Sequence, residues 1–265
     1  MTLKNEDIHK GVSEFYAGLV KEGGGDCCSG CCTPDTGAAC CPPEIKTGIA
    51  ESVGYTAQDL EAIPAEASGS SFGCGNPLAF AEVKPGESVL DLGSGGGIDC
   101  FIAADRVGKS GRVIGLDMTE EMIDKATKTA EQNGYDNVEF RFGKIEEMPV
   151  ETGSVDWVIS NCVINLSPEK QRVFAETFRV LRPGGRLLIS DVVAEDLPAA
   201  MRNDISAWAS CVAGAVTEGE YLGMIRDAGF EQVEIVDRLD YVNPSEQQPY
   251  KLASIRVRGI KKSET

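Results

Sequence analysis

Short apolar runs alternate with helical patterns through the middle of the chain, and this alternation limits the possible folds more than any other feature. Strands that alternate with helices are typical of repeated βα units around a parallel sheet. Five runs have the aliphatic and β-branched content of strands that are buried on both faces: residues 88–92, 112–117, 138–142, 155–160 and 186–191. The sequence therefore predicts an α/β fold.

Two of the helices between and after these strands carry clear end signals. Residues 119–133 begin with a threonine at the N-cap, have two glutamates in the first turn and end before Gly134. A later helix opens with the capping box Thr217 and Glu220 and ends near Gly229. These signals fix where the helices start and stop.

The two ends of the chain differ in character. Residues 231–236 and 253–259 are predicted to be an antiparallel strand pair, which gives a seven-stranded, mostly parallel sheet with helices on both faces. Residues 1–70 are predicted to hold a helix near 7–20 and a Cys-rich and Gly-rich segment without periodicity. We therefore divide the chain into an N-terminal segment, 1–70, and a main domain, 71–265.

Charge and composition narrow the range of partners. The chain has 25 basic and 42 acidic residues, a net charge of −17, which argues against a groove that binds nucleic-acid phosphates. No apolar run approaches the roughly 20 residues of a membrane span, and the polar start lacks the layout of a signal peptide. We expect a cytoplasmic monomer without a membrane partner. Ten cysteines in a reducing compartment favour metal or metalloid binding, or redox chemistry, over a disulfide framework.

A glycine-rich loop, "VLDLGSGGGID", follows the first predicted strand. Glycines let the backbone turn tightly and let a ligand approach it closely. The dinucleotide pattern G-x-G-x-x-G is incomplete, because Ile98 stands where the third glycine would be, so NAD is disfavoured. Asp117 ends the second strand, where a carboxylate can accept both hydroxyls of a ribose. Loop and acid together predict a site for a nucleotide-like ligand.

Four segments, "VLDLGSGGG", "GLDMTEEM", "NVEFRFGKIEEMP" and "RVLRPGGRLLISD", resemble the motifs of class I S-adenosylmethionine-dependent methyltransferases, which have a Rossmann-like fold. In that family the glycine loop holds the methionine part of the cofactor, the acid of the second strand binds the ribose, and residues after the third strand flank the adenine. Met122 either packs on the cofactor or fills the core. The resemblance implies these further cofactor contacts: Gly93, Ser94, Gly95, Asp117, Met118, Ile145 and Glu146.

The chain offers few candidates for a general base but several thiols. His9 is the sole histidine and is predicted to be a solvated helix residue. Cys100 is predicted to be a small buried apolar residue. Cys74 lies in the bend "FGCGNP" and Cys162 at a strand end, so both are candidates for partly exposed, reactive thiols. Soft thiolates select soft metals and metalloids, and trivalent arsenic keeps a lone pair that attacks a sulfonium methyl group without a general base.

The cysteine contexts "FGCGNP", "SNCVINLSPEK" and "CVAGA" are similar to those of arsenite S-adenosylmethionine methyltransferases. The resemblance implies that Cys162 and Cys211 hold As(III), that Cys74 is a third ligand and redox partner, and that an upstream cysteine, Cys41 or Cys40, forms a disulfide with it. It also implies an As(III)-binding insert around 192–216. Arsenite or its thiol complex would be the substrate, with thioredoxin or glutathione as the reductant.

Other features near the N-terminus are less determined. Phe72 stands where family members often have tyrosine, so ring stacking on the cofactor is kept without a hydroxyl contact. The extra cysteines either bind a metal such as zinc, shuttle arsenite or electrons, or form a loop without a role: Cys27, Cys28, Cys31 and Cys32.

Two other functions fit the same sequence. A carbon or oxygen methyltransferase acting on a small organic acceptor would use the cysteines only structurally. A non-catalytic protein that sequesters a metalloid would keep the cofactor fold without using it, which the intact loop at Gly93 and the acid Asp117 argue against.

Overall fold

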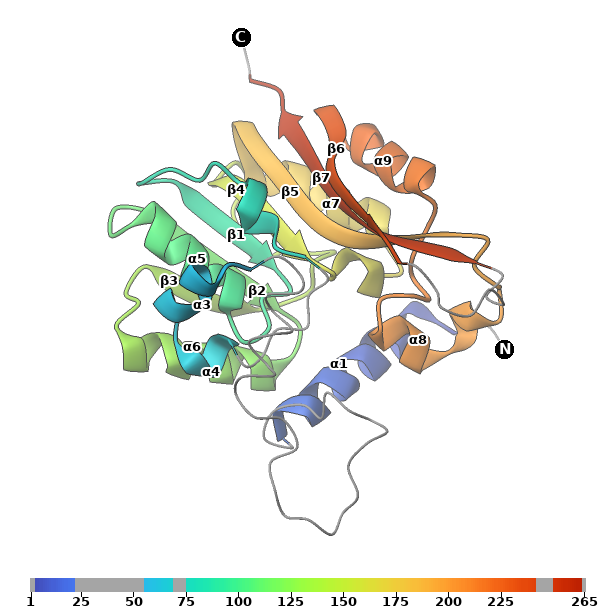
Figure 1. Ribbon diagram of the computed structural model, residues 1–265, viewed down its shortest axis with the longest axis horizontal. Helices are drawn as coiled ribbons and strands as arrows, with labels where there is room; N and C mark the ends of the chain where they lie inside the picture. Colours follow the sequence, from blue (N-terminus) through green and yellow to red (C-terminus); the bar gives the residue numbers. More distant parts are fainter. Residues whose placement is uncertain (1–2, 22–54, 69–74, 242–249, 264–265) are drawn as a thin grey trace.

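The computed structural model describes residues 3–21, 55–68, 75–241 and 250–263 (Figure 1). Its centre is a seven-stranded sheet in the spatial order β3-β2-β1-β4-β5-β7-β6. The first five strands are parallel, and β7 is antiparallel to both of its neighbours, which confirms the predicted mixed sheet. The strands are β1 (Ser88–Leu92), β2 (Arg112–Asp117), β3 (Val138–Phe142), β4 (Val155–Asn161), β5 (Leu181–Glu195), β6 (Phe230–Asp240) and β7 (Lys251–Lys261).

The later strands are longer than the sequence predicts. β5 has 15 residues and pairs with β7 from Arg186 to Glu195. Its extension through Val192, Val193 and Ala194 is buried on both faces, so the period of two that usually marks a strand is missing there. The start of the predicted insert at 192–216 is therefore strand. The rest of that stretch forms η3 (Met201–Asn203) and α8 (Ile205–Ala209).

The helix ends follow the predicted signals closely. The capping box of Thr217 and Glu220 is present, with both reciprocal hydrogen bonds. Gly134 follows its helix in the left-handed conformation, with φ of 72°, which a glycine adopts without steric cost. The main helices are α1 (Asn5–Lys21), α5 (Ile98–Val107), α6 (Glu120–Asn133), α7 (Lys170–Val180) and α9 (Glu218–Asp227).

Helices cover both faces of the sheet (Figure 1). Successive residues of β1 point to opposite faces: Val89 packs in the cluster with α5, and Leu90 packs in the cluster that contains Phe174 of α7 and Ile225 of α9. A third cluster lies at the carboxyl end of the sheet, where α1 packs against α8. Figure 1 shows this helix pair beyond the strand ends.

Residues 55–68 belong to the core, although the sequence analysis placed them in a segment apart. They form α3 (Ala57–Ala62) and α4 (Ala65–Ser68), with Leu60 and Ile63 in the cluster on the α5 face. A capping box at Thr56 starts α3. Helices this short carry too little periodicity to be recognised. The boundary at residue 70 stays a prediction, because 69–74 lie outside the described residues.

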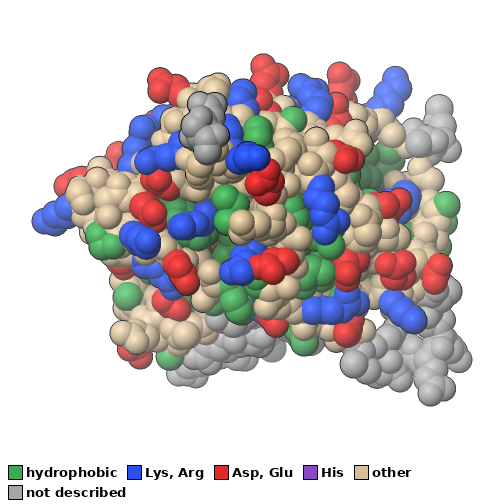
Figure 2. All heavy atoms as spheres, turned by 90° about the horizontal axis from the view of Figure 1, so that it is seen from above, with side chains coloured by type: hydrophobic (Ala, Val, Ile, Leu, Met, Phe, Trp, Pro, Cys, Tyr) green, Lys and Arg blue, Asp and Glu red, His purple; other side chains and the backbone are tan. Residues whose placement is uncertain are grey.

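Acidic and basic side chains alternate over the outer face seen in Figure 2, with apolar side chains in small groups between them. Neighbouring opposite charges make ion pairs, such as Arg182 with Asp156 at 2.6 Å. Within the part of the chain that the structure describes, no helix combines the length and apolar character that a bilayer crossing requires.

Candidate active site

A cavity of about 910 Å³ lies at the carboxyl ends of β1, β2 and β4. The chain order reverses between β1 and β4, and in open α/β sheets ligands bind in the crevice at such a switch point. The fold therefore places a binding site where the glycine loop was predicted to act.

The glycine loop forms one wall of this cavity. Gly93 has φ of +67°, and a Cβ there would lie 2.3 Å from a methyl carbon of Val163, so no other residue fits. Gly95 has φ of +51° and faces open space, which leaves its backbone accessible to a ligand. Ser94 lines the cavity, and its Oγ is buried without a hydrogen-bond partner among the described residues. A buried hydroxyl without a partner is costly, which points to a polar ligand group at this place.

Asp117 lies at the end of β2, as predicted, and lines the cavity with Met118 and Met122. Its carboxylate accepts hydrogen bonds from the backbone N–H groups of Gly95 and Thr119, both at 2.9 Å. Burial raises the pKa of Asp117, and these backbone donors oppose the shift. The carboxylate is thus held in one orientation at the rim of the cavity.

A second acidic group, which the sequence analysis missed, lies beneath the loop. Asp91 and Asp99 are both buried, at 2% and 3% exposed, and both line the cavity. The hydroxyl of Tyr55 donates to Asp99 Oδ2 at 2.9 Å, and the side-chain amide of Asn161 donates to the Tyr55 oxygen at 2.9 Å. Burial raises the pKa of Asp99 to about 6 against these donors, and raises the pKa of Asp91 as well.

This acidic lining has an electrostatic consequence. The described residues around the cavity include three aspartates and one glutamate but no lysine or arginine. A buried carboxylate without a cationic partner favours a positively charged ligand. The two aspartates could have been suspected from the sequence, because Asp91 is next to the end of the first strand and Asp99 lies in the first turn of the next helix. Nothing in the sequence indicates Tyr55.

His9 corrects a prediction. It is not a solvated helix residue: it is 9% exposed, and its Nε2 lies 2.9 Å from Glu146 Oε1. Ser167 also donates to that oxygen. These donors lower the pKa of Glu146 against the opposing effect of burial. The prediction failed because helix position alone does not show which face is covered, and here α1 lies over the cavity, with His9 and Val12 in its lining.

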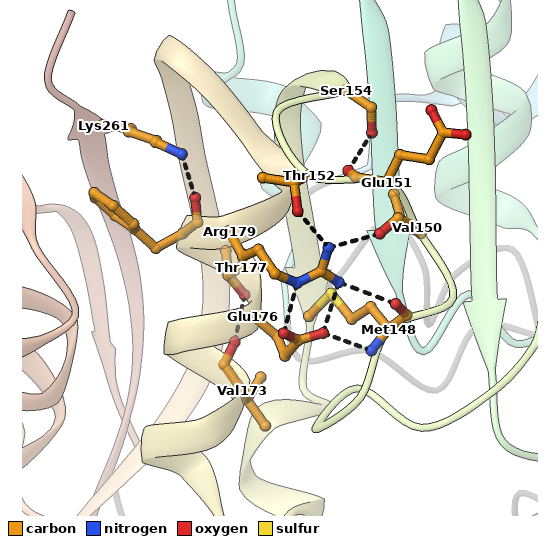
Figure 3. Close-up of polar contacts among 11 residues, drawn as sticks. Met148, Val150, Glu151, Thr152, Ser154, Val173, Glu176, Thr177, Arg179 and Lys261 are labelled. Carbon is orange, nitrogen blue, oxygen red and sulfur yellow. Dashed lines mark hydrogen bonds and ion pairs between the residues drawn. The ribbon is translucent and has the colours of Figure 1, made fainter. Parts of the chain in front are cut away.

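The segment that carries Ile145 and Glu146 is braced from behind by Arg179 of α7 (Figure 3). The guanidinium donates to the backbone oxygens of Val150 and Met148, at 2.8 and 3.0 Å, and pairs with Glu176 through two hydrogen bonds of 2.7 Å. Such a two-pronged pair fixes geometry better than a single contact. The cavity wall after β3 is therefore held by a rigid helix.

Cys162 and Cys211 come together at a second cavity beside the first. The thiol of Cys211 donates to the backbone oxygen of Cys162 at 2.8 Å, although 49 residues separate them in sequence. Both residues have left-handed backbones, with φ of 63° and 59°. For a residue with a Cβ this conformation costs free energy and is uncommon. Asp196 and Gln232 also adopt it.

The two thiols differ in state. Cys162 is disulfide-bonded, whereas Cys211 is a free thiol. Burial raises the pKa of Cys211, and the nearby charge of Asp191 raises it further, while the ammonium of Lys170 opposes both effects. Cys162 was expected to be partly exposed and is instead buried, at 6%. The strand end is covered because α1 and α8 pack over it.

Cys100 is fully buried and free, in agreement with its prediction as a small core residue. The other predicted positions lie outside the described residues: Cys74, Cys40, Cys41, Phe72, Cys27, Cys28, Cys31 and Cys32. Among the residues that are described, no group of three or more potential ligands converges on a metal position.

The main cavity fits a nucleoside ligand that carries a positive charge. The open backbone at Gly95, the buried hydroxyl of Ser94 and the carboxylate of Asp117 suit a polar ligand with a ribose, and the acidic lining suits its charge. S-adenosylmethionine, with its sulfonium and ammonium groups, has these properties.

Comparison with known proteins agrees with this geometry. The family model described as "Methyltransferase domain" matches residues 83–229. An arsenite methyltransferase of Halobacterium salinarum is 49% identical over 88% of this chain and 60% of its own length, and the human arsenite methyltransferase is 34% identical over 86% and 59%. The chain thus spans about three-fifths of the length of these curated relatives.

A solved structure shows the same similarity in three dimensions. The crystal structure of an arsenic (III) S-adenosylmethionine methyltransferase from Chlamydomonas reinhardtii superposes with a TM-score of 0.71. Its sequence is 34% identical, and the match covers 77% of this chain and 73% of that one.

Proposed function

Because the chain belongs to the arsenite methyltransferases, we propose that it transfers methyl groups from S-adenosylmethionine to trivalent arsenic held by cysteine thiols. The observation that carries the proposal is the pair Cys162 and Cys211. They are 49 residues apart, both have left-handed backbones, and both border the cavity beside the cofactor pocket. Strained backbone at two converging thiols is expected where binding geometry, not packing, determines the structure.

The cofactor side of the proposal uses residues of the main cavity. When bound there, S-adenosylmethionine supplies a sulfonium methyl group to a nucleophile. Asp117 would accept hydrogen bonds from the ribose hydroxyls, while Gly93, Ser94 and Gly95 would line the methionine part. Met118, Met122, Ile145 and Glu146 would enclose the rest.

The acceptor side favours arsenic over an organic alcohol or amine. The described residues that line the thiol cavity are aromatic, aliphatic, serine and cysteine, with no histidine, carboxylate or lysine to act as a general base. The arsenic lone pair needs none, since it forms the new As–C bond while the sulfonium S–C bond breaks. Thiols hold the soft arsenic centre in place, so catalysis rests on positioning.

Two electrons must return to arsenic, because methyl transfer raises its formal oxidation state from +3 to +5. We propose that Cys74 and an upstream cysteine supply both electrons as they close to a disulfide, which thioredoxin or glutathione then reduces. The disulfide at Cys162 would need the same reduction before this sulfur could bind arsenic. We further propose that the enzyme is a monomer that detoxifies arsenic. We place it in the cytoplasm, because ten cysteines require a reducing compartment to remain available as thiols.

Arsenic speciation tests this function. The protein is incubated with arsenite, S-adenosylmethionine and a dithiol reductant, and arsenic species are separated by chromatography with mass detection. Wild type should form methylated arsenic, and Cys211→Gly should reduce the rate at least about 1000-fold, as expected when a group that holds the reacting atom is removed.

Gln232→Gly is the matched control, because Gln232 is an exposed residue of β6 with a left-handed backbone, φ of 52°. It should keep the wild-type rate. An active Cys211→Gly enzyme would contradict the proposed role of the thiol, and no product from wild type despite cofactor binding would contradict arsenic as the acceptor.

A further inference from the structure

Two residues line both the cofactor cavity and the thiol cavity: Cys162 and Tyr16. Cys162 already has a place in the proposed reaction. Tyr16 does not, and it comes from α1, a helix that no motif of the sequence connects with either site. A side chain that borders both donor and acceptor cavities is in a position to influence the step between them.

The fold places Tyr16 there through the packing of α1. This helix packs against α6 on the cofactor side and against α8 on the thiol side (Figure 1). Ile8 and Val12, on the same face, are buried at 4% and 0% exposed. The Phe15 ring meets the Tyr16 ring edge to face, with centroids 5.4 Å apart. Tyr16 is therefore fixed by neighbours along the helix and beneath it.

The polar end of Tyr16 contacts the segment that carries the free thiol. Its hydroxyl donates a hydrogen bond to the backbone oxygen of Ala209, at 3.1 Å. Ala209 ends α8, two residues before Cys211, whose own backbone N–H bonds to Trp208. The contact thus ties α1 to the turn in which Cys211 adopts its left-handed conformation.

The surroundings of the phenol connect it with both sites. Burial raises the pKa of Tyr16, and its electrostatic interactions with Cys211 and Asp117 raise it further. Asp117 belongs to the cofactor cavity and Cys211 to the thiol cavity. The hydroxyl stays protonated and acts as a hydrogen-bond donor, not as a base.

We propose that Tyr16 is a positioning residue for methyl transfer: its ring forms the wall shared by the two cavities and shields the Cys211 thiol, and its hydroxyl fixes the turn at Ala209. The inference rests on the proposed function for the reaction itself. The shielding of Cys211 does not rest on the proposed function, because it is a property of the protein without ligands.

The shielding is tested by alkylation of the ligand-free, reduced protein with iodoacetamide, with each cysteine followed by peptide mass. In Tyr16→Ala the rate at Cys211 should rise at least about 10-fold, because reactivity follows access to the thiol. In Tyr16→Phe, which keeps the ring, the rate should change less than about 3-fold. Cys100, fully buried in another cluster, is the internal control and should stay unreactive in every variant.

The positioning role is tested by kinetics under the conditions of the arsenic assay. Tyr16→Ala should lower kcat about 100-fold, with the KM for S-adenosylmethionine within about 3-fold of wild type, since a small misplacement of reacting groups costs about that much. Tyr16→Phe loses one hydrogen bond and should keep kcat within about 5-fold. Glu14→Ala, an exposed position two residues away on the same helix, should match wild type.

Three results would overturn the inference: wild-type kcat in Tyr16→Ala, unchanged alkylation of Cys211, or Cys100 becoming reactive in parallel, which would mean that α1 only stabilises the fold. Failure of the proposed function looks different. In that case wild type itself forms no methylated arsenic, while the alkylation result still decides whether Tyr16 shields Cys211.

Discussion

The cofactor cavity has glycine backbone and four carboxylates among its apolar lining, whereas the described residues that line the thiol cavity beside it include no charged side chain. At the glycine loop the left-handed positions are glycines, which adopt them without cost. At the thiol cavity the left-handed positions are Cys162 and Cys211, where the Cβ makes the conformation unfavourable. Of the two cavities, the strained backbone is thus found at the thiols and not at the glycine loop.

The strongest test of this division removes Asp117. Asp117→Ala should weaken binding of S-adenosylhomocysteine at least about 100-fold, because it removes the proposed acceptor of both ribose hydroxyls, and a hydrogen bond to a charged group is worth about 1.5–3 kcal/mol. Isothermal titration calorimetry measures this affinity.

Arsenite binding by the same variant is the control. It can be followed by fluorescence, because buried Trp208 packs in the cluster that contains both thiols. It should stay within about 3-fold of wild type, since Asp117 does not line the thiol cavity. A loss of both affinities would show that the two cavities form one cooperative site.

The two regions should also differ in how pH changes the stability that an aspartate in each of them contributes. The pKa of Asp99 is raised to about 6, above its value in the unfolded chain, so its contribution to stability is lost as pH rises from about 4 to about 6. Asp99→Asn cannot ionise and should gain about 1–3 kcal/mol relative to wild type between pH 4 and pH 7.5, measured by urea unfolding.

Asp204 caps α8 on the thiol side, and its hydrogen bonds to Ser206 lower its pKa, so its stabilising effect is lost as pH falls. Asp204→Asn should therefore deviate from wild type in the opposite direction to Asp99→Asn. The same sign in both variants would contradict the opposite pKa shifts of Asp99 and Asp204.

The smallest effect concerns backbone strain at Cys211. Because its φ is 63°, Cys211→Gly should be more stable than Cys211→Ala by about 1 kcal/mol. Cys100 lies inside α5, where the order should reverse, with glycine less stable than alanine by about 1 kcal/mol. Chemical denaturation of the four variants gives both differences, and the same order at both positions would mean that Cys211 is not strained.

The two cavities also differ in how well the sequence predicted their residues. The glycine loop and Asp117 follow strands with clear apolar patterns, so their place at one edge of the sheet follows from local signals and the βα rule. Cys162 was located by the same reasoning. Cys211 lies in a short turn after α8 and was assigned only by resemblance.

Residues brought in by tertiary packing could not be predicted. His9, Tyr16 and Tyr55 reach the cavities because α1 packs against α6 and α8, and because the segment with α3 packs in the cluster on the α5 face. No local pattern shows which face of an amphipathic helix meets a ligand cavity. His9 was assigned to solvent for this reason. β5 was predicted too short, because its buried end lacks the alternation of apolar and polar residues that marks a strand.

The docking of α1 also bears on how the protein is made. Two of its polar contacts reach forward 137 residues, from His9 to Glu146, and 193 residues, from Tyr16 to Ala209. On the ribosome the helix emerges long before either partner exists, at synthesis rates of about 5–20 residues per second. The sheet can start to assemble before α1 has anything to close over, so both cavities mature last. During that interval Cys162 and Cys211 lack the cover that α1 and α8 give them in the folded chain.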